Sequence, residues 1–241
     1  MFPFMLLWSD SLTESIDADV EPATEPGARP ERKEATRRRI LDAALEVFAE
    51  RGYHEAIVDE IVRVSNTSKG AFYFHFPSKQ EIFLRLVDEL VERLARKAEA
   101  AIVAAKGPEA KVDAALGAVF DAFAGHRQLA KILLVDVVGL GRAFDQKLLG
   151  ARGRLALVIQ RYLDQAVAAG DIQPLDTELA AAAWLGAINE VVVRWLHTGR
   201  PASLDAARPA LRRLLLRSVG AWTVSPDLKT AISPHQASSG R

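Results

Sequence analysis

The stretch from Thr67 to Glu81 reads TSKGAFYFHFPSKQE and predicts two helix starts separated by a proline. Ser68 carries a hydroxyl that can accept a hydrogen bond from the first free amides of a short helix. Pro77 ends this helix, because proline lacks an amide hydrogen and disfavours a helical conformation in the residue before it. Ser78 and Glu81 then have the S-x-x-E spacing of a capping box, which starts a new helix. We therefore expect a short helix that is bounded on both sides.

An amphipathic helix precedes the short one. Ile57, Ile61 and Val64 recur at i, i+4 and i+7, which predicts a helix over residues 55–64. Two helices joined by such a short turn have the spacing of a helix-turn-helix unit, whose second helix enters the DNA major groove. The predicted base contacts are Lys69, Ala71 and Phe72, beside Thr67 and Ser68, and the predicted phosphate contacts are Tyr73, His75 and Lys79. Phe74 and Phe76 are predicted to be core aromatic residues.

Residues 36–83 resemble the DNA-binding region of the TetR family of bacterial transcriptional regulators. The matched positions are Gly52, Ser68, Gly70, Tyr73, His75, Phe76, Ser78, Lys79 and Glu81. The sequence departs from the family pattern at Ala56, where Thr is usual, and at Val62, Ser65, Asn66 and Thr67. So many matched positions are more specific than a single short motif. The resemblance implies a DNA-binding regulator, most often a repressor, that acts as a homodimer on a palindromic operator.

The whole chain is predicted to be all-α. A first helix over residues 36–51 carries Arg37 and Arg38 at its start, where cations oppose the helix dipole and suit a phosphate partner. A long helix follows Ser78 and reaches about Ala105, and further helices are expected over 109–124, 127–138, 144–169, 176–198 and 204–222. The predicted domains are a disordered acidic extension (1–35), a helix-turn-helix domain (36–83), a helical ligand-binding and dimerisation domain (84–222) and a disordered tail (223–241).

The composition argues against several other classes of protein. The chain of 241 residues contains no cysteine, which excludes disulfides and cysteine-ligated zinc and fits a reducing cytoplasm. No apolar run is long enough for a transmembrane helix, so we expect no membrane partner. The five histidines show no metal-ligand spacing, and no nucleophile or phosphate-binding loop is recognisable. We therefore expect no enzyme activity, no cofactor and no metal.

The helix expected over residues 176–198 is apolar on two faces, so it must be covered twice. One face can pack inside its own domain, and the other is a candidate dimer surface, which the resemblance also implies. The residues predicted for the dimer interface are Ala182, Gly186, Val193, Leu211, Leu215 and Trp222. A helical dimer that uses its head to contact a protein remains an alternative, and salt-dependent binding to a duplex distinguishes the two hypotheses.

Residues 109–169 carry more apolar side chains than one buried face per helix requires. A plain helical core explains them without the resemblance, whereas the resemblance implies an effector pocket. The predicted lining is Phe120, Phe123, Leu133, Leu134, Val137, Phe144, Leu157, Trp184, Ile188 and Asn189. This mostly neutral lining suits a long or bulky apolar ligand.

The stretches GDIQPLD (170–176) and NEVVVRWLHTG (189–199) are similar to the fatty-acid-responsive members of the family. This similarity implies a fatty acid or an acyl-CoA as effector. The phosphates of an acyl-CoA would need cations such as Lys131, Arg142 or Arg194. A multidrug-type sensor with an aromatic effector is the alternative.

Overall fold

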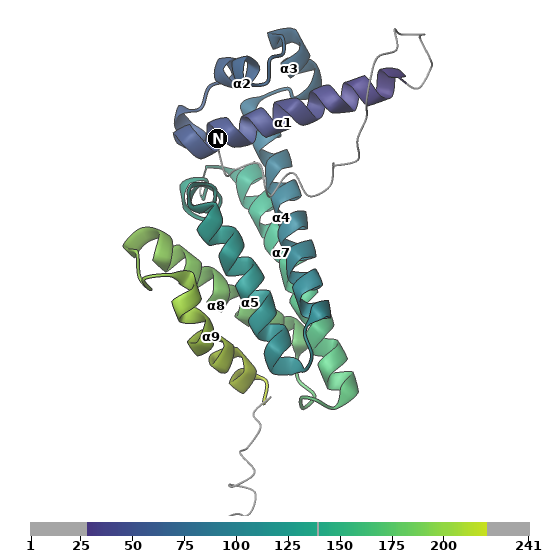
Figure 1. Ribbon diagram of the computed structural model, residues 1–241, viewed down its shortest axis with the longest axis vertical. Coiled ribbons are helices and arrows are strands. Elements are labelled where there is room, and N and C mark those ends of the chain that lie inside the picture. The colour runs from purple at the N-terminus through teal and green to yellow at the C-terminus, as the bar shows by residue number, and fades with distance from the viewer. Residues whose placement is uncertain (1–27, 139, 221–241) are drawn as a thin grey trace, which may run out of the picture. The chain divides into compact units, whose positions relative to one another are not determined.

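The structure is a computed structural model that describes residues 28–138 and 140–220, and the secondary structure in these ranges is helical (Figure 1). The described residues from Arg37 onward belong to one compact unit, and those before Arg37 belong to a second unit, considered by itself. The helices are α1 (Ala28–Glu55), α2 (Val58–Val64), α3 (Lys69–His75), α4 (Lys79–Ala104), α5 (Pro108–Gly125), α6 (Arg127–Lys131), the π-helix η2 (Ile132–Asp136), α7 (Arg142–Ala169), α8 (Thr177–Thr198) and α9 (Leu204–Ser218). The predicted all-α class is confirmed.

Helix α1 begins at Ala28 and not at the predicted Thr36, so the prediction of disorder is wrong for residues 28–35. Pro30 lies in the first turn, where a missing amide hydrogen costs nothing, and residues 31–35 are good helix formers. Gly52 has φ 81° and ψ 169°, which interrupts the regular helix at the predicted position. The rest of the predicted extension, residues 1–27, and the predicted tail lie outside the described residues.

The N-terminal part of this unit, here called the head, comprises α1 from Arg37 onward together with α2 and α3. Its buried apolar side chains include Ile40, Leu41, Ala44, Phe48, Ile61, Phe72 and Phe76. Ile57 was predicted on this buried face, but it is 55% exposed. The reason is that Ile57 precedes α2 as its N-cap, in an extended conformation with φ −116°. Helix α2 is therefore shorter than the predicted helix.

Helix α4 leaves the head and packs against both α5 and α7, and α7, α8 and α9 complete the C-terminal part (Figure 1). A buried cluster, here called the core cluster, draws on α5, α6, α7, α8 and α9. Its members are Leu116, Phe120, Ala130, Leu163, Ile172, Ala181, Trp184, Val192, Trp195, Leu196, Leu204, Leu211, Leu215 and Val219. The α5–α9 packing is close at Gly117, where an added Cβ would lie 2.6 Å from Nη1 of Arg208.

The helix predicted over 127–138 is instead divided into α6 and η2 and ends at Asp136. In η2 the amide of Val137 donates to the carbonyl of Ile132 at 3.1 Å, the i to i+5 bond of a π-helix. Helix α7 begins at Arg142, slightly before the predicted residue 144, because Gly141 precedes it with φ 129°. Helix α9 ends at Ser218, and residues 221 and 222 of the predicted helix lie outside the described part of the chain.

Ion pairs join α4 to α7. Asp88 of α4 accepts from Lys147 and, at 2.8 Å, from Nη2 of Arg154, while Glu99 accepts from Arg161. The three bases recur every seventh residue of α7, so they lie along one side of this helix. Acidic side chains of α4 and basic side chains of α7 thus face each other along what we call the charged seam.

Helix α8 is long and apolar enough to cross a membrane by length and composition alone. Helices that contribute to the core of a water-soluble protein pass the same test. Ala181, Trp184, Val192 and Trp195 of α8 belong to the core cluster. Its apolar composition is therefore partly explained by packing within the chain.

Candidate nucleic-acid interface and effector domain

The turn between α2 and α3 is held by its own hydroxyl groups. Asn66 has φ 49°, a left-handed conformation that asparagine tolerates. Ser65 Oγ donates to the carbonyl of Val62 at 3.2 Å and lies 2.8 Å from Oγ1 of Thr67. Ser68 caps α3, because its Oγ accepts from the amide of Ala71 at 3.1 Å. Thr67 and Ser68, both predicted DNA contacts, therefore also fix the start of α3.

The exposed side of α3 differs from the predicted one at two aromatic residues. Phe72 is fully buried, so the prediction of a base contact there is wrong. Phe74 is 69% exposed, so its prediction as a core residue is also wrong, whereas Phe76 is buried as predicted. Positions 72 and 76 are four apart and share one helix face, while Phe74 lies on another.

Tyr73 and Phe74 are consecutive aromatic residues on α3, and both are exposed. Tyr73 is 47% exposed, which is compatible with the predicted phosphate contact. The half-buried His75 lies against Phe74, with ring centroids 5.1 Å apart. Ala71 is half-buried at the start of the same helix. These residues bring a hydroxyl, an imidazole and an apolar ring to the accessible side of α3.

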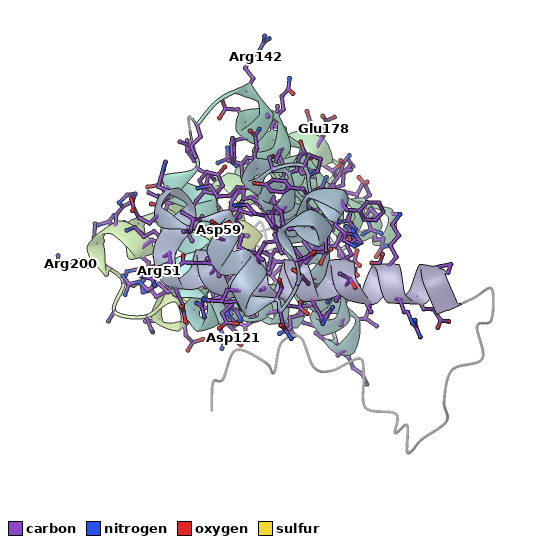
Figure 2. All side chains as sticks on the ribbon, turned by 90° about the horizontal axis from the view of Figure 1, so that it is seen from above. Arg51, Asp59, Asp121, Arg142, Glu178 and Arg200 are labelled. Atoms are coloured by element: carbon purple, nitrogen blue, oxygen red, sulfur yellow. The ribbon has the colours of Figure 1, made fainter. Side chains whose placement is uncertain are left out.

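Lys69 lies at the exposed start of α3 and pairs with α2. Its Nζ is 2.6 Å from Oδ1 of Asp59, and this hydrogen-bonded carboxylate raises the pKa of Lys69. Asp59 and Arg51 are labelled in Figure 2, which views the molecule from above. The ion pair holds the Lys69 ammonium on the outer surface of the helix pair, where a base edge or a phosphate can compete for it.

Lys79 does not present its ammonium as predicted. Nζ donates to three backbone carbonyls, those of Tyr53 (2.8 Å), His54 (3.1 Å) and Ala56 (2.9 Å). An ammonium has three donors, so these bonds leave none for a phosphate. Nζ also lies 4.7 Å from the centroid of the Tyr53 ring, and burial lowers the pKa of Lys79. In this structure Lys79 instead satisfies two carbonyls at the end of α1 and that of Ala56 before α2, which contradicts the predicted phosphate contact.

Two predicted phosphate contacts on α1, Arg37 and Arg38, also contact residues within the chain. Arg38 Nη1 is 3.6 Å from Oε2 of Glu89 on α4, and its Nε is 3.6 Å from Asp42. The guanidinium carbon of Arg37 lies 5.5 Å from the ring centroid of Phe76. Arg38 remains 43% exposed, so it can link α1 to α4 and still meet a phosphate.

Tyr53 belongs to an aromatic group that was not predicted. Its ring centroid lies 4.9 Å from that of Phe83 on α4 and 5.3 Å from that of Phe144 on α7. Phe144, predicted to line an effector pocket, packs here against Tyr53 and Phe83 and lies outside the core cluster that holds Phe120 and Trp184. The sequence carried no signal for this contact, because it joins residues far apart in the chain.

The other predicted effector residues differ in burial. Phe120 and Trp184 belong to the core cluster, and Phe123, Leu134 and Ile188 are partly buried against it. Val137 is fully buried, and Leu133 and Asn189 are half-buried. Leu157 is 58% exposed, so its prediction as a pocket residue is wrong. Trp184 Nε1 donates to Ser218 Oγ at 3.0 Å, which ties α8 to α9.

The predicted dimer residues are also divided. Leu211 and Leu215 of α9 lie in the core cluster, so their assignment to an interface is wrong. Ala182 and Gly186 of α8 are exposed, and an added Cβ on Gly186 would meet nothing within 4 Å. Leu179 (67% exposed) and Leu214 (60% exposed) lie on α8 and α9 and were not predicted. Val193 is half-buried, and Trp222 lies outside the described residues.

Comparisons with known proteins give one family match for the N-terminal part of the chain and one for the C-terminal part. Residues 40–86 match the model for bacterial regulatory proteins of the tetR family, and residues 105–219 match that for tetracyclin repressor-like C-terminal domains. The chain is 25% identical over 181 residues to the fatty acid metabolism regulator protein of Bacillus subtilis, covering 75% of this chain and 93% of the relative.

Two solved structures are similar over most of their length. One is the fatty acid degradation regulator FadR from Bacillus halodurans (26% identity, TM-score 0.67, covering 74% of this chain and 97% of that chain). The other is the transcriptional regulator FadR from Bacillus subtilis, solved in complex with stearoyl-CoA (25% identity, TM-score 0.67, covering 77% and 99%). Among the residues that the structure describes, no group of three or more possible metal ligands occurs.

Proposed function

Since the chain belongs to the TetR family of bacterial transcriptional regulators, which bind DNA, respond to ligands and are not enzymes, we propose that it is a homodimeric repressor released from a palindromic operator by a long-chain acyl-CoA. The observation that carries the DNA-binding part is the capped helix α3 with an exposed cation and two exposed aromatic side chains. The proposed DNA contacts are Arg37, Arg38, Ser68, Lys69, Tyr73, Phe74 and His75. Such a regulator acts where the DNA is, in the cytoplasm.

The exposed side of α8 supports the dimer. Leu179, Ala182, Ala183 and Gly186 follow the i, i+3, i+4 and i+7 pattern of one helix face and are all exposed. Small side chains allow a second helix to approach closely, and Leu214 of α9 is a further exposed apolar side chain. A two-fold dimer would bury this face against its own copy. It would also present two α3 helices to two half-sites.

The effector domain supports an acyl chain as ligand. Phe123, Leu134 and Ile188 pack against the core cluster without being fully buried, so an apolar chain can replace solvent beside them. The π-helix η2 contributes Leu134 to this lining, and π-helical turns occur frequently at functional sites. Lys131, Arg142 and Arg194 are exposed and can supply cations for the phosphates of a thioester. The relative solved with stearoyl-CoA supports the same class of ligand.

The test is release of a duplex selected by the protein from a random-sequence library. Stearoyl-CoA, free stearate and a planar aromatic cation are titrated against the labelled complex, and binding is followed by fluorescence anisotropy. Release by stearoyl-CoA at lower concentration than by stearate supports the proposal, because only the thioester brings phosphates. Release by the aromatic cation alone would establish a multidrug-type sensor in its place. A ligand must favour one state to shift the equilibrium, so tight binding without release contradicts the proposal.

A further inference from the structure

Tyr53 lies where the head, α4 and α7 meet. It follows Gly52, whose positive φ turns the chain out of the regular part of α1. Its ring contacts Phe83 and Phe144 with tilts of 63° and 77°, the edge-to-face arrangement that aromatic pairs prefer. Phe144 is only 5% exposed, so its contact with the head is part of the packed interior and not a surface contact.

Lys79 holds the other side of Tyr53. Its Nζ lies over the Tyr53 ring and donates to the Tyr53 carbonyl, and it also donates to the carbonyl of Ala56 just before α2. Lys79 is itself the first residue of α4. Any shift of the Tyr53 ring therefore acts on both the start of α2 and the first turn of α4. These two elements determine where α3 lies.

Phe144 is connected to the core cluster through a short stretch of chain. It lies in the first turn of α7, and η2 precedes it at residues 132–136. Ile132 of η2 is fully buried, and Leu134 and Val135 pack against the core cluster. A π-helix and an α-helix differ in the partner of each amide, so rearranging the Val137–Ile132 bond would change the path that leads to Phe144.

We infer that the contact between Tyr53 and Phe144 is the joint through which the core cluster controls the DNA-binding head. Tyr53 and Phe144 are positioning residues in this mechanism and touch neither DNA nor effector. The inference needs DNA binding but not the identity of the effector. Energetic coupling between two sites is reciprocal, so DNA bound at α3 must also stabilise η2 and the first turn of α7.

The experiment is amide hydrogen exchange of the full chain, measured by mass spectrometry with and without the selected duplex. In the wild-type protein the duplex is expected to slow exchange in α3 and also, by about fivefold or more, in peptides covering residues 132–144. In Phe144→Leu, the slowing in α3 remains and the slowing in residues 132–144 is lost. Phe144→Met supplies a longer, more flexible apolar side chain of similar volume to leucine and provides the same comparison if the leucine variant unfolds.

Leu157→Ala is the matched control, because Leu157 lies on α7 but is 58% exposed. This control should retain the slowing in both regions. Tyr53→Leu, which alters the other partner, should lose it in residues 132–144 as Phe144→Leu does. The inference is overturned if the duplex protects residues 132–144 equally in the Phe144 variants and the wild type. Loss of protection in α3 as well would also overturn it, because Phe144 would then support the fold of the head and not its coupling.

Discussion

The ammonium of Lys79 serves the fold of the head, since its three donors meet three carbonyls. Lys79→Ala leaves these carbonyls without a charged donor and is expected to lower the free energy of unfolding by about 1–2 kcal/mol. Lys69→Ala is the control, because Lys69 is exposed and pairs only with the exposed Asp59 among the contacts described. Urea unfolding should shift for Lys79→Ala and stay nearly unchanged for Lys69→Ala. The opposite order would show that the three carbonyl contacts of Lys79 do not stabilise the head.

Phe74 brings an exposed apolar ring to α3, and rings of this kind contact the methyl group of thymine in the major groove. Phe74→Ser is expected to weaken binding of the selected duplex by about tenfold, which corresponds to ~1.4 kcal/mol. The midpoint of thermal unfolding should change little, because the ring is 69% exposed. Fluorescence anisotropy and circular dichroism measure the two quantities. Unchanged affinity together with a lower midpoint would show that Phe74 belongs to the core.

Two helices with different proposed roles, α3 and α9, begin with serine caps of nearly equal geometry. Ser68 caps α3 and Ser203 caps α9, each accepting an amide hydrogen bond at 3.1 Å. Replacing either serine with alanine should cost about 1 kcal/mol of stability. Only Ser68→Ala should also weaken duplex binding, because α3 carries the proposed DNA contacts. Equal affinities for the two variants, measured by anisotropy, would remove α3 from the DNA interface.

The elements that the sequence predicts well are those determined by local chemistry. The caps at Ser68 and Ser78 form as predicted, because a hydroxyl three residues before a free amide needs no distant partner. The π-helix was missed because an apolar run such as residues 132–138 has the same pattern in either kind of helix. The burial of Phe72 and the exposure of Phe74 were predicted the wrong way round, because four aromatic residues within positions 72–76 give no periodicity. The Phe144 contact depends on tertiary packing alone.

For the whole molecule, the exposed face of α8 predicts a dimer. Gly186→Arg places a charge on this face in open space, so the chain should keep its helical content but sediment as a monomer. Half-sites about one helical turn apart (~34 Å) then cannot be bound together, and affinity for a palindromic duplex should fall. Gly153→Arg is the control, because Gly153 is equally open and lies on α7. Analytical ultracentrifugation that shows a dimer for both variants would contradict this interface.

Because ion pairs join α4 to α7 in the charged seam, the response to effector should depend on ionic strength. Asp88 and Glu99 are partly accessible in these pairs, and such pairs contribute only ~0–1 kcal/mol each in water. Added salt shortens the screening length from about 10 Å at 0.1 M to about 3 Å at 1 M, which weakens them further. Phe83 of α4 contacts Phe144 of α7, so weaker ion pairs between these helices should weaken the coupling between the effector and the head. Salt should therefore reduce the size of the response to effector, separately from its effect on DNA affinity.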